Sequence, residues 1–245
     1  MTLYRFVTPV FSAIYPRLIN LVALGATEEI TILYHKSAQL MSVIILPAAL
    51  VVALFSKEIL LLWTQSSETA EHTHVLVSIL VIGTAFNGLM HIPYAMQLAS
   101  GWTQLALLGN VVSVLLLSPL VIILTKCYGA TGAASVWVIL NVGYMLISLP
   151  IMHRRLLPTE KWRWYLHDVC LPLMASITIA GLGRLFIVYQ PSQFMTIIYI
   201  LIISISTLAV TAMTTSTTRT WLFNWLLSTK LIRFQLLRKK RRDKS

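Results

Sequence analysis

The sequence predicts an all-α integral membrane protein, a polytopic bundle of about six transmembrane helices preceded by a partial helix. Of the 245 residues, 57% are hydrophobic and 11% are charged, and the mean hydropathy is +0.79. A typical soluble domain has about 45–50% apolar and about 25% charged residues, so this chain has too few charges to cover a water-facing surface. Two further observations are six long apolar stretches and a concentration of Lys and Arg in alternate loops.

Six stretches have the length and composition of membrane helices. Crossing about 30 Å of hydrocarbon takes about 17–25 mostly apolar residues. The stretches that qualify contain no Asp or Glu and are residues 38–55, 75–99, 104–125, 130–152, 169–189 and 195–213. They are continuous runs without the alternation of a β-barrel, so helices are expected.

The first 25 residues are also apolar, but Arg5, Pro9, Pro16 and Arg17 interrupt them. They fit a secretory signal poorly and fit the last part of a helix better. The expected organisation is therefore a partial transmembrane helix and cytoplasmic connector at 1–37, a six-helix bundle at 38–213, and a basic cytoplasmic tail at 214–245.

Lys and Arg residues predict the orientation. If the six helices simply alternate, 15 of the 19 fall on one side: Arg17, Lys36, four in the loop 153–168 and nine in the tail from Arg219 to Lys244. Positive charge collects on the cytoplasmic side, so both chain ends are expected in the cytoplasm. Membrane orientation accounts for the basic residues, and nucleic acid is not an expected partner.

The stretch 75–99 is the richest in polar side chains. Asn87, His91, Tyr94 and Gln97 follow one another at spacings of four, three and three, which places them on one helical face. Pro93, beside that face, removes a backbone donor and frees a carbonyl. A polar cavity and hydrogen bonding between helices both explain this pattern.

Four other polar side chains of the predicted spans are also candidates for a site. Asn110, Asn141 and Tyr144 are sparser and fit either interhelical hydrogen bonds or the wall of the same cavity. Arg184, near the end of its stretch, either extends to the outer interface or faces inward, where it would bind phosphate.

Catalysis is not expected. No nucleophile elbow, phosphate loop or cysteine cluster is present, and the acid–base candidates reduce to Glu160, Asp168, His153 and His167 in one loop between cations. No metal site or cofactor is predicted. The loop 153–165 mixes basic and aromatic residues, as an interfacial membrane anchor does.

Several ordered motifs resemble the second half of bacterial oligosaccharide and polysaccharide flippases. They lie between residues 5 and 185 and include Tyr15 to Leu18, Leu33 to Lys36, Leu62 to Thr64, Gln97 to Trp102, Tyr128 to Ala134 and Met152 to Pro158. Asn87-Gly88 and Pro93-Tyr94 belong to the same set.

The resemblance implies membership of the multidrug, oligosaccharidyl-lipid and polysaccharide exporter superfamily. Such proteins have two lobes around a central cavity that opens to one side at a time, and this chain is similar to the C-terminal lobe alone. The N-terminal lobe is then missing, and a fragment, a split gene product or a truncated reading frame is expected.

The implied substrate is an undecaprenyl-pyrophosphate-linked glycan, for O-antigen or another surface polysaccharide, moved across the bacterial inner membrane. Asn87, His91, Tyr94 and Gln97 are expected to face the sugar. The near-membrane cations available for pyrophosphate are Arg5, Arg17 and Arg184. The expected partners are membrane lipid and a missing lobe or glycan-assembly proteins.

An alternative hypothesis is a truncated, non-transporting membrane scaffold that holds partners of a glycan-assembly complex through its basic face. A membrane transferase is disfavoured because the predicted spans contain no acidic residues.

Overall fold

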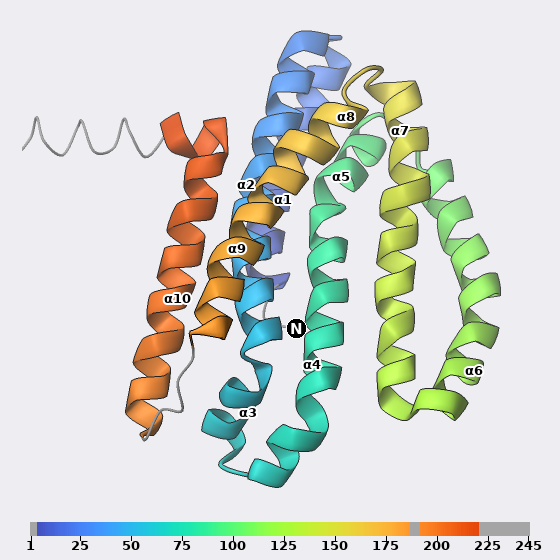
Figure 1. Cartoon of the computed structure of the whole chain (residues 1–245). Helices are drawn as coiled ribbons and strands as arrows, with labels where there is room; N and C mark the ends of the chain where they lie inside the picture. Colours follow the sequence, from blue (N-terminus) through green and yellow to red (C-terminus); the bar gives the residue numbers. More distant parts are fainter. Residues whose placement is uncertain (1–3, 187–191, 221–245) are drawn as a thin grey trace, which may run out of the picture.

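The computed structural model describes residues 4–186 and 192–220, and every regular element within these ranges is a helix (Figure 1). Five helical segments are long and apolar enough to cross a membrane: Thr27–Leu54, Ser67–Ala99, Gln104–Leu156, Lys161–Leu185 and Gln193–Thr214. The third turns back on itself at Gly129, so these segments make six antiparallel passes. The predicted fold class, an all-α polytopic membrane protein, is confirmed.

The elements, in chain order, are α1 (Tyr4–Ala23), α2 (Thr27–Leu54), α3 (Ser56–Thr64), α4 (Ser67–Leu89), α5 (His91–Ala99), α6 (Gln104–Gly143), η1 (Tyr144–Ser148), α7 (Leu149–Leu156), α8 (Lys161–Arg163), η2 (Trp164–Cys170), α9 (Leu171–Leu185) and α10 (Gln193–Thr214). η1 and η2 are π-helical turns inside longer helices.

Local sequence explains where several helices begin. The hydroxyls of Ser66 and Ser192 accept hydrogen bonds from the backbone N–H groups of Thr69 and Met195, which caps α4 and α10. Glu28 and Glu29 lie in the first turn of α2, where a negative charge interacts favourably with the helix dipole.

A single glycine forms the turn within α6. Gly129 has φ 61° and ψ −142°, a conformation open to glycine and strained for other residues. The two legs of α6 therefore run in opposite directions on either side of it, which gives the hairpin at the right of Figure 1.

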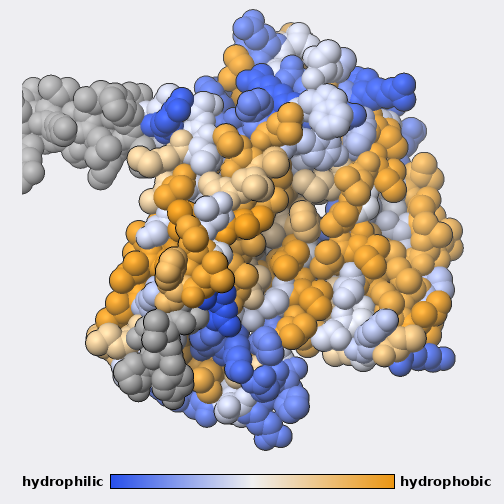
Figure 2. Space-filling model, in the orientation of Figure 1, coloured by the Kyte–Doolittle hydropathy of each residue, from blue (hydrophilic) through white to orange (hydrophobic). Residues whose placement is uncertain are grey.

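The bundle has two polar ends and an apolar belt. One end carries the junction of α1 and α2, the segments 100–103 and 157–160, and the end of α10 (Figure 1). We call it the basic end, because Arg17, Lys36 and the cations of 154–163 lie there. α3 and the Gly129 turn lie at the opposite end. Hydrophobic side chains cover the region between the ends in Figure 2, as expected for a bilayer-spanning protein.

α2 lies at the centre of the core and packs against α1, α4, α9 and α10. Its buried side chains include Tyr34, Met41 and Ile45. Glycines let the helices approach closely: a Cβ on Gly83 would lie 2.4 Å from Cδ1 of Trp137.

The structure differs from the sequence-based boundaries at two places. Residues 27–37, expected as a connector, form the first turns of α2, because Tyr34 and His35 are buried and hydrogen-bonded there. The helical segment leading into α9 begins at Lys161 and not at 169.

The orientation of the chain ends is a separate question. α1 runs beside α2, and its first described residue lies away from the basic end. The cytoplasmic placement of both chain ends stays a prediction. Most of the predicted tail, 221–245, lies outside the described residues.

Candidate functional site

A helix break divides the row of polar side chains formed by Asn87, His91, Tyr94 and Gln97, which we call the polar stripe. Pro93 has no N–H, and its ring conflicts with the carbonyl four residues earlier, at Leu89. α4 ends at Leu89 and α5 begins at His91, with Met90 between them. The break separates Asn87 from the other members of the stripe, yet all four still face one pocket.

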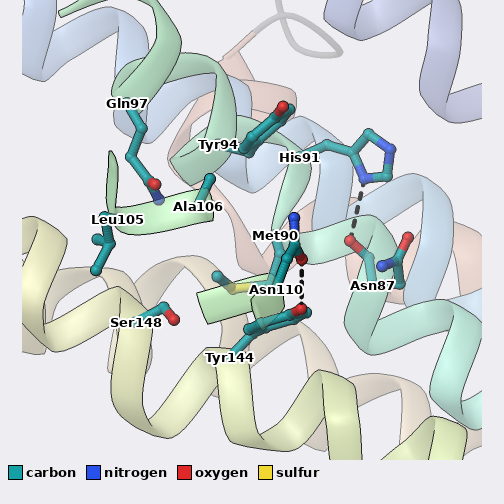
Figure 3. A pocket seen from close by; sticks show the side chains of 10 residues that line it. All are labelled: Asn87, Met90, His91, Tyr94, Gln97, Leu105, Ala106, Asn110, Tyr144 and Ser148. Carbon is teal, nitrogen blue, oxygen red and sulfur yellow. Dashed lines mark hydrogen bonds between the residues drawn. The ribbon is translucent and has the colours of Figure 1, made fainter. Parts of the chain in front are cut away.

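The pocket has a volume of about 280 Å³ and lies between α4–α5, the first leg of α6 and η1 (Figure 3). Six of the seven side chains predicted to line a cavity line it: Asn87, His91, Tyr94, Gln97, Asn110 and Tyr144. Met90, Leu105, Ala106 and Ser148 complete its wall. None of these ten residues is Asp, Glu, Lys or Arg, so the pocket offers neutral donors and acceptors and, in His91, a single ionisable imidazole.

The far wall of the pocket comes from α6 and η1. The Tyr144 hydroxyl donates a 2.6 Å hydrogen bond to Oδ1 of Asn110, which joins η1 to the first leg of α6 (Figure 3). π-helical turns are often found at functional sites, and η1 places both Tyr144 and Ser148 on the pocket.

Gln97 is a buried side chain of the stripe whose hydrogen-bonding capacity is not filled among the described residues. It is 4% exposed, and its Oε1 has no hydrogen-bond partner among the described residues. A buried carbonyl oxygen without a partner is costly unless water or a ligand bonds it. The Gln97 side chain lines the pocket in Figure 3, so its amide is a candidate group for bonding a pocket occupant.

Asn141 holds helices together. It is fully buried, and its Oδ1 accepts a 2.8 Å hydrogen bond from Nδ2 of Asn87, while its own Nδ2 donates to the Trp137 carbonyl at 2.8 Å. It supports the pocket from behind without lining it. The stripe therefore serves both interpretations offered by the sequence, a cavity lining and interhelical bonding.

The structure does not bring the three predicted pyrophosphate cations together. Arg5 and Arg17 are exposed on α1, about 18 Å apart along its axis at about 1.5 Å per residue. Arg184 forms an ion pair with Glu58 of α3 and lies 5.7 Å from the Phe55 ring centroid. Glu58 thus neutralises the charge of Arg184. The pair lies at the end of the bundle opposite the basic end.

A buried cluster of ionisable and amide side chains at the basic end was not predicted. His35 of α2 is 2% exposed; its Nδ1 contacts Oδ2 of Asp168, and its Nε2 lies 2.9 Å from Oε2 of Glu160. Asp168, in η2, is fully buried and accepts a 2.9 Å hydrogen bond from Nε2 of Gln39. Thr217 bonds the other end of the Gln39 amide, at 2.7 Å. We call His35, Asp168, Glu160 and Gln39 the clamp.

The clamp joins three segments through the His35 ring. Both ring nitrogens of His35 face carboxylate oxygens, one on Asp168 and one on Glu160. Since the clamp joins α2 to 157–170 and to 216–217, it ties the outer helices to the core.

Few features of the sequence indicate this cluster. His35 lies in a stretch that was expected to be a connector, and 133 positions separate it from Asp168. Of the four loop residues considered for catalysis, His167 is exposed, and His153 is buried beside Tyr34, whose hydroxyl lies 3.2 Å from its Nε2. Among the residues that the structure describes, no group of His, Cys, Asp and Glu is arranged to hold a metal ion.

A family model described as MatE matches residues 5–124, from α1 to the end of the first leg of α6. No curated protein and no solved structure matches the chain. The match supports the broad multidrug, oligosaccharidyl-lipid and polysaccharide exporter superfamily and indicates a membrane transporter. It includes the polar stripe and Asn110, and it ends before Asn141 and Tyr144.

Proposed function

We propose that this chain is the C-terminal lobe of a lipid-linked oligosaccharide flippase of the bacterial inner membrane. The lobe would move an undecaprenyl-pyrophosphate-linked glycan, for O-antigen or another surface polysaccharide, by alternating access together with a second lobe. The MatE match supports a transporter rather than an enzyme.

The observation that carries the proposal is the chemistry of the pocket. Amide, imidazole and hydroxyl groups surround it, and the Gln97 carbonyl lacks a hydrogen-bond partner in the part of the chain that the structure describes. Sugar hydroxyls both donate and accept hydrogen bonds, so they match this lining. A cationic drug gains most from a carboxylate, and none of the ten lining residues provides one.

The surroundings of the pocket suit a ligand with an apolar tail. A second pocket of about 480 Å³ shares Asn110 and Tyr144 with the first. Its other lining residues come from the two legs of α6 and are mostly apolar: Ser113, Val114, Leu117, Ser118, Val121, Ala133, Val136, Trp137 and Leu140. A polar head in the first pocket and a hydrocarbon chain in the second therefore fit one amphipathic molecule.

The pyrophosphate needs cations that the pocket lacks. Arg5 and Arg17 remain the candidates on this lobe, because Arg184 is paired with Glu58. The second lobe, or glycan-assembly proteins bound to the basic end, would supply the remaining cations.

Replacing Gln97 tests the proposal. Gln97→Leu keeps the side-chain size and removes an amide whose carbonyl has no partner among residues 4–186 and 192–220, so the fold should be retained while sugar binding is lost. The variant replaces the native gene at its chromosomal position, so that the neighbouring genes are kept. We expect surface glycan to fall at least about tenfold, and a tenfold change corresponds to about 1.4 kcal/mol. Glycan is measured by gel and immunoblot.

Gln193→Leu is the matched control. Gln193 is exposed at the opposite end and bonds Gln65, so the same chemical change there should leave export unchanged. Normal export with Gln97→Leu at equal protein level contradicts the transport proposal and favours the non-transporting scaffold.

A further inference from the structure

A separate pocket of about 480 Å³ lies at the basic end, between α7 and α8. Its lining residues are Pro150, Ile151, His153, Arg154, Thr159, Lys161 and Trp162. It shares no residue with the pocket lined by Asn87 and Gln97, and five of its seven residues lie in the loop 153–165, for which the sequence suggested a membrane anchor.

The charge around this pocket is basic and uncompensated. Arg154 and Lys161 line it, and no Asp or Glu does. Within 4–186 and 192–220, no carboxylate lies within ion-pair distance of either cation. His153 is already engaged, since its Nδ1 lies 3.1 Å from the Leu149 carbonyl and its Nε2 faces Tyr34.

Neighbouring cations of the same loop do have partners. Arg163 lies 3.5 Å from Oε2 of Glu160, and the Arg155 guanidinium lies 4.4 Å from the Trp102 ring centroid. The Lys161 ammonium lies 4.6 Å from the Trp162 ring centroid, a contact that leaves its charge unneutralised. Arg154 and Lys161 are thus set apart from the other cations by the pocket that they share.

The walls of the pocket place it at the boundary between the apolar belt and the polar end. Ile151 is 44% exposed and Trp162 is 64% exposed. Tryptophan is enriched at the level of lipid headgroups. Thr159 has a φ of 76°, strained for a β-branched residue, and this turn brings Lys161 back to the side of Arg154.

We propose that this pocket binds the phosphate of an anionic membrane-lipid headgroup. The planar Arg154 guanidinium can bind phosphate oxygens through two N–H groups, and Lys161 adds a point charge from the other side. The apolar wall of Ile151, Pro150 and Trp162 then accommodates the glycerol and the first part of the acyl chains. Basic pockets on the cytoplasmic side of membrane helices bind such headgroups. The site does not depend on the transport proposal.

The test measures lipid binding to the purified full chain in detergent by native mass spectrometry. The probes are dioleoylphosphatidylglycerol, dioleoylphosphatidylcholine and inorganic phosphate. We expect phosphatidylglycerol to bind and Arg154→Gln to weaken it at least about tenfold, or about 1.4 kcal/mol. Arg155→Gln changes the adjacent residue by the same charge outside the pocket, so it should weaken binding less than about twofold, as for an exposed charge.

Three results would overturn the proposal. Equal weakening by Arg154→Gln and Arg155→Gln would show diffuse surface attraction rather than a site. Equal binding of phosphatidylcholine would remove the anionic requirement. Displacement of phosphatidylglycerol by millimolar-range inorganic phosphate would assign the pocket to a free anion and not to a lipid. Gel filtration and helical circular dichroism confirm that both variants are folded.

Discussion

Single residues of the bundle show how polar groups are accommodated inside an apolar protein. Both polar atoms of Asn141 are bonded, to Asn87 and to the Trp137 carbonyl, whereas the buried Gln97 carbonyl has no partner within the described residues. Helical periodicity predicted that Asn87 and Gln97 share a face, and the structure places both on one pocket. Periodicity does not reveal which polar atoms neighbouring helices satisfy, because that depends on contacts more than fifty positions away.

The clamp is the clearest residue-scale prediction. His35→Leu would leave the carboxyl group of Asp168 buried without its imidazole partner, and a buried polar group that loses its partner typically costs about 1–3 kcal/mol. We expect a lower midpoint of thermal unfolding in detergent, followed by tryptophan fluorescence. Lys36→Leu, at the neighbouring exposed position, should change the midpoint little. An unchanged midpoint for His35→Leu would show that the clamp does not stabilise the fold.

At the scale of elements, local signals predicted most helices, and tertiary contacts decided their limits. Length and apolarity located the six passes, and Pro93 marked the break beside the polar stripe. The start of α2 was missed because residues 27–37 are polar and hydropathy therefore assigned them to a loop. Burial of Tyr34 and His35 against residues more than 115 positions away is what extends that helix.

The hairpin of α6 gives a prediction at this scale. Gly129→Ala puts a Cβ on a residue with φ 61° and ψ −142°, which should destabilise the bundle by about 1–3 kcal/mol. Gly143→Ala is the matched control: Gly143 is helical and an added Cβ meets no atom within 4 Å, so stability should stay or rise by up to about 1 kcal/mol. Unfolding in increasing sodium dodecyl sulfate measures both. Equal stability of the two variants would mean that the turn tolerates a side chain.

At the scale of the whole molecule, the basic loops and the apolar belt agree on a membrane bundle with one basic end. The six passes follow from alternation of the apolar stretches. The convergence of Asn110 and Tyr144 on the polar stripe does not follow from that alternation, because it depends on how the first leg of α6 packs against α4–α5. The substrate assignment depends on that convergence, because it makes a neutral polar pocket inside a hydrophobic protein.

Solvent accessibility of the pocket is the most direct test. In a background with Cys127 and Cys170 replaced by alanine, single cysteines are introduced as Asn110→Cys, Tyr94→Cys and, on the apolar face of α6, Leu115→Cys. Membranes containing each variant are treated with a water-soluble maleimide. We predict labelling at positions 94 and 110 and none at 115, although Leu115 is 69% exposed in the isolated bundle, because lipid covers it. Unreactive cysteines at 94 and 110, with full labelling after detergent solubilisation, would contradict a water-filled sugar pocket.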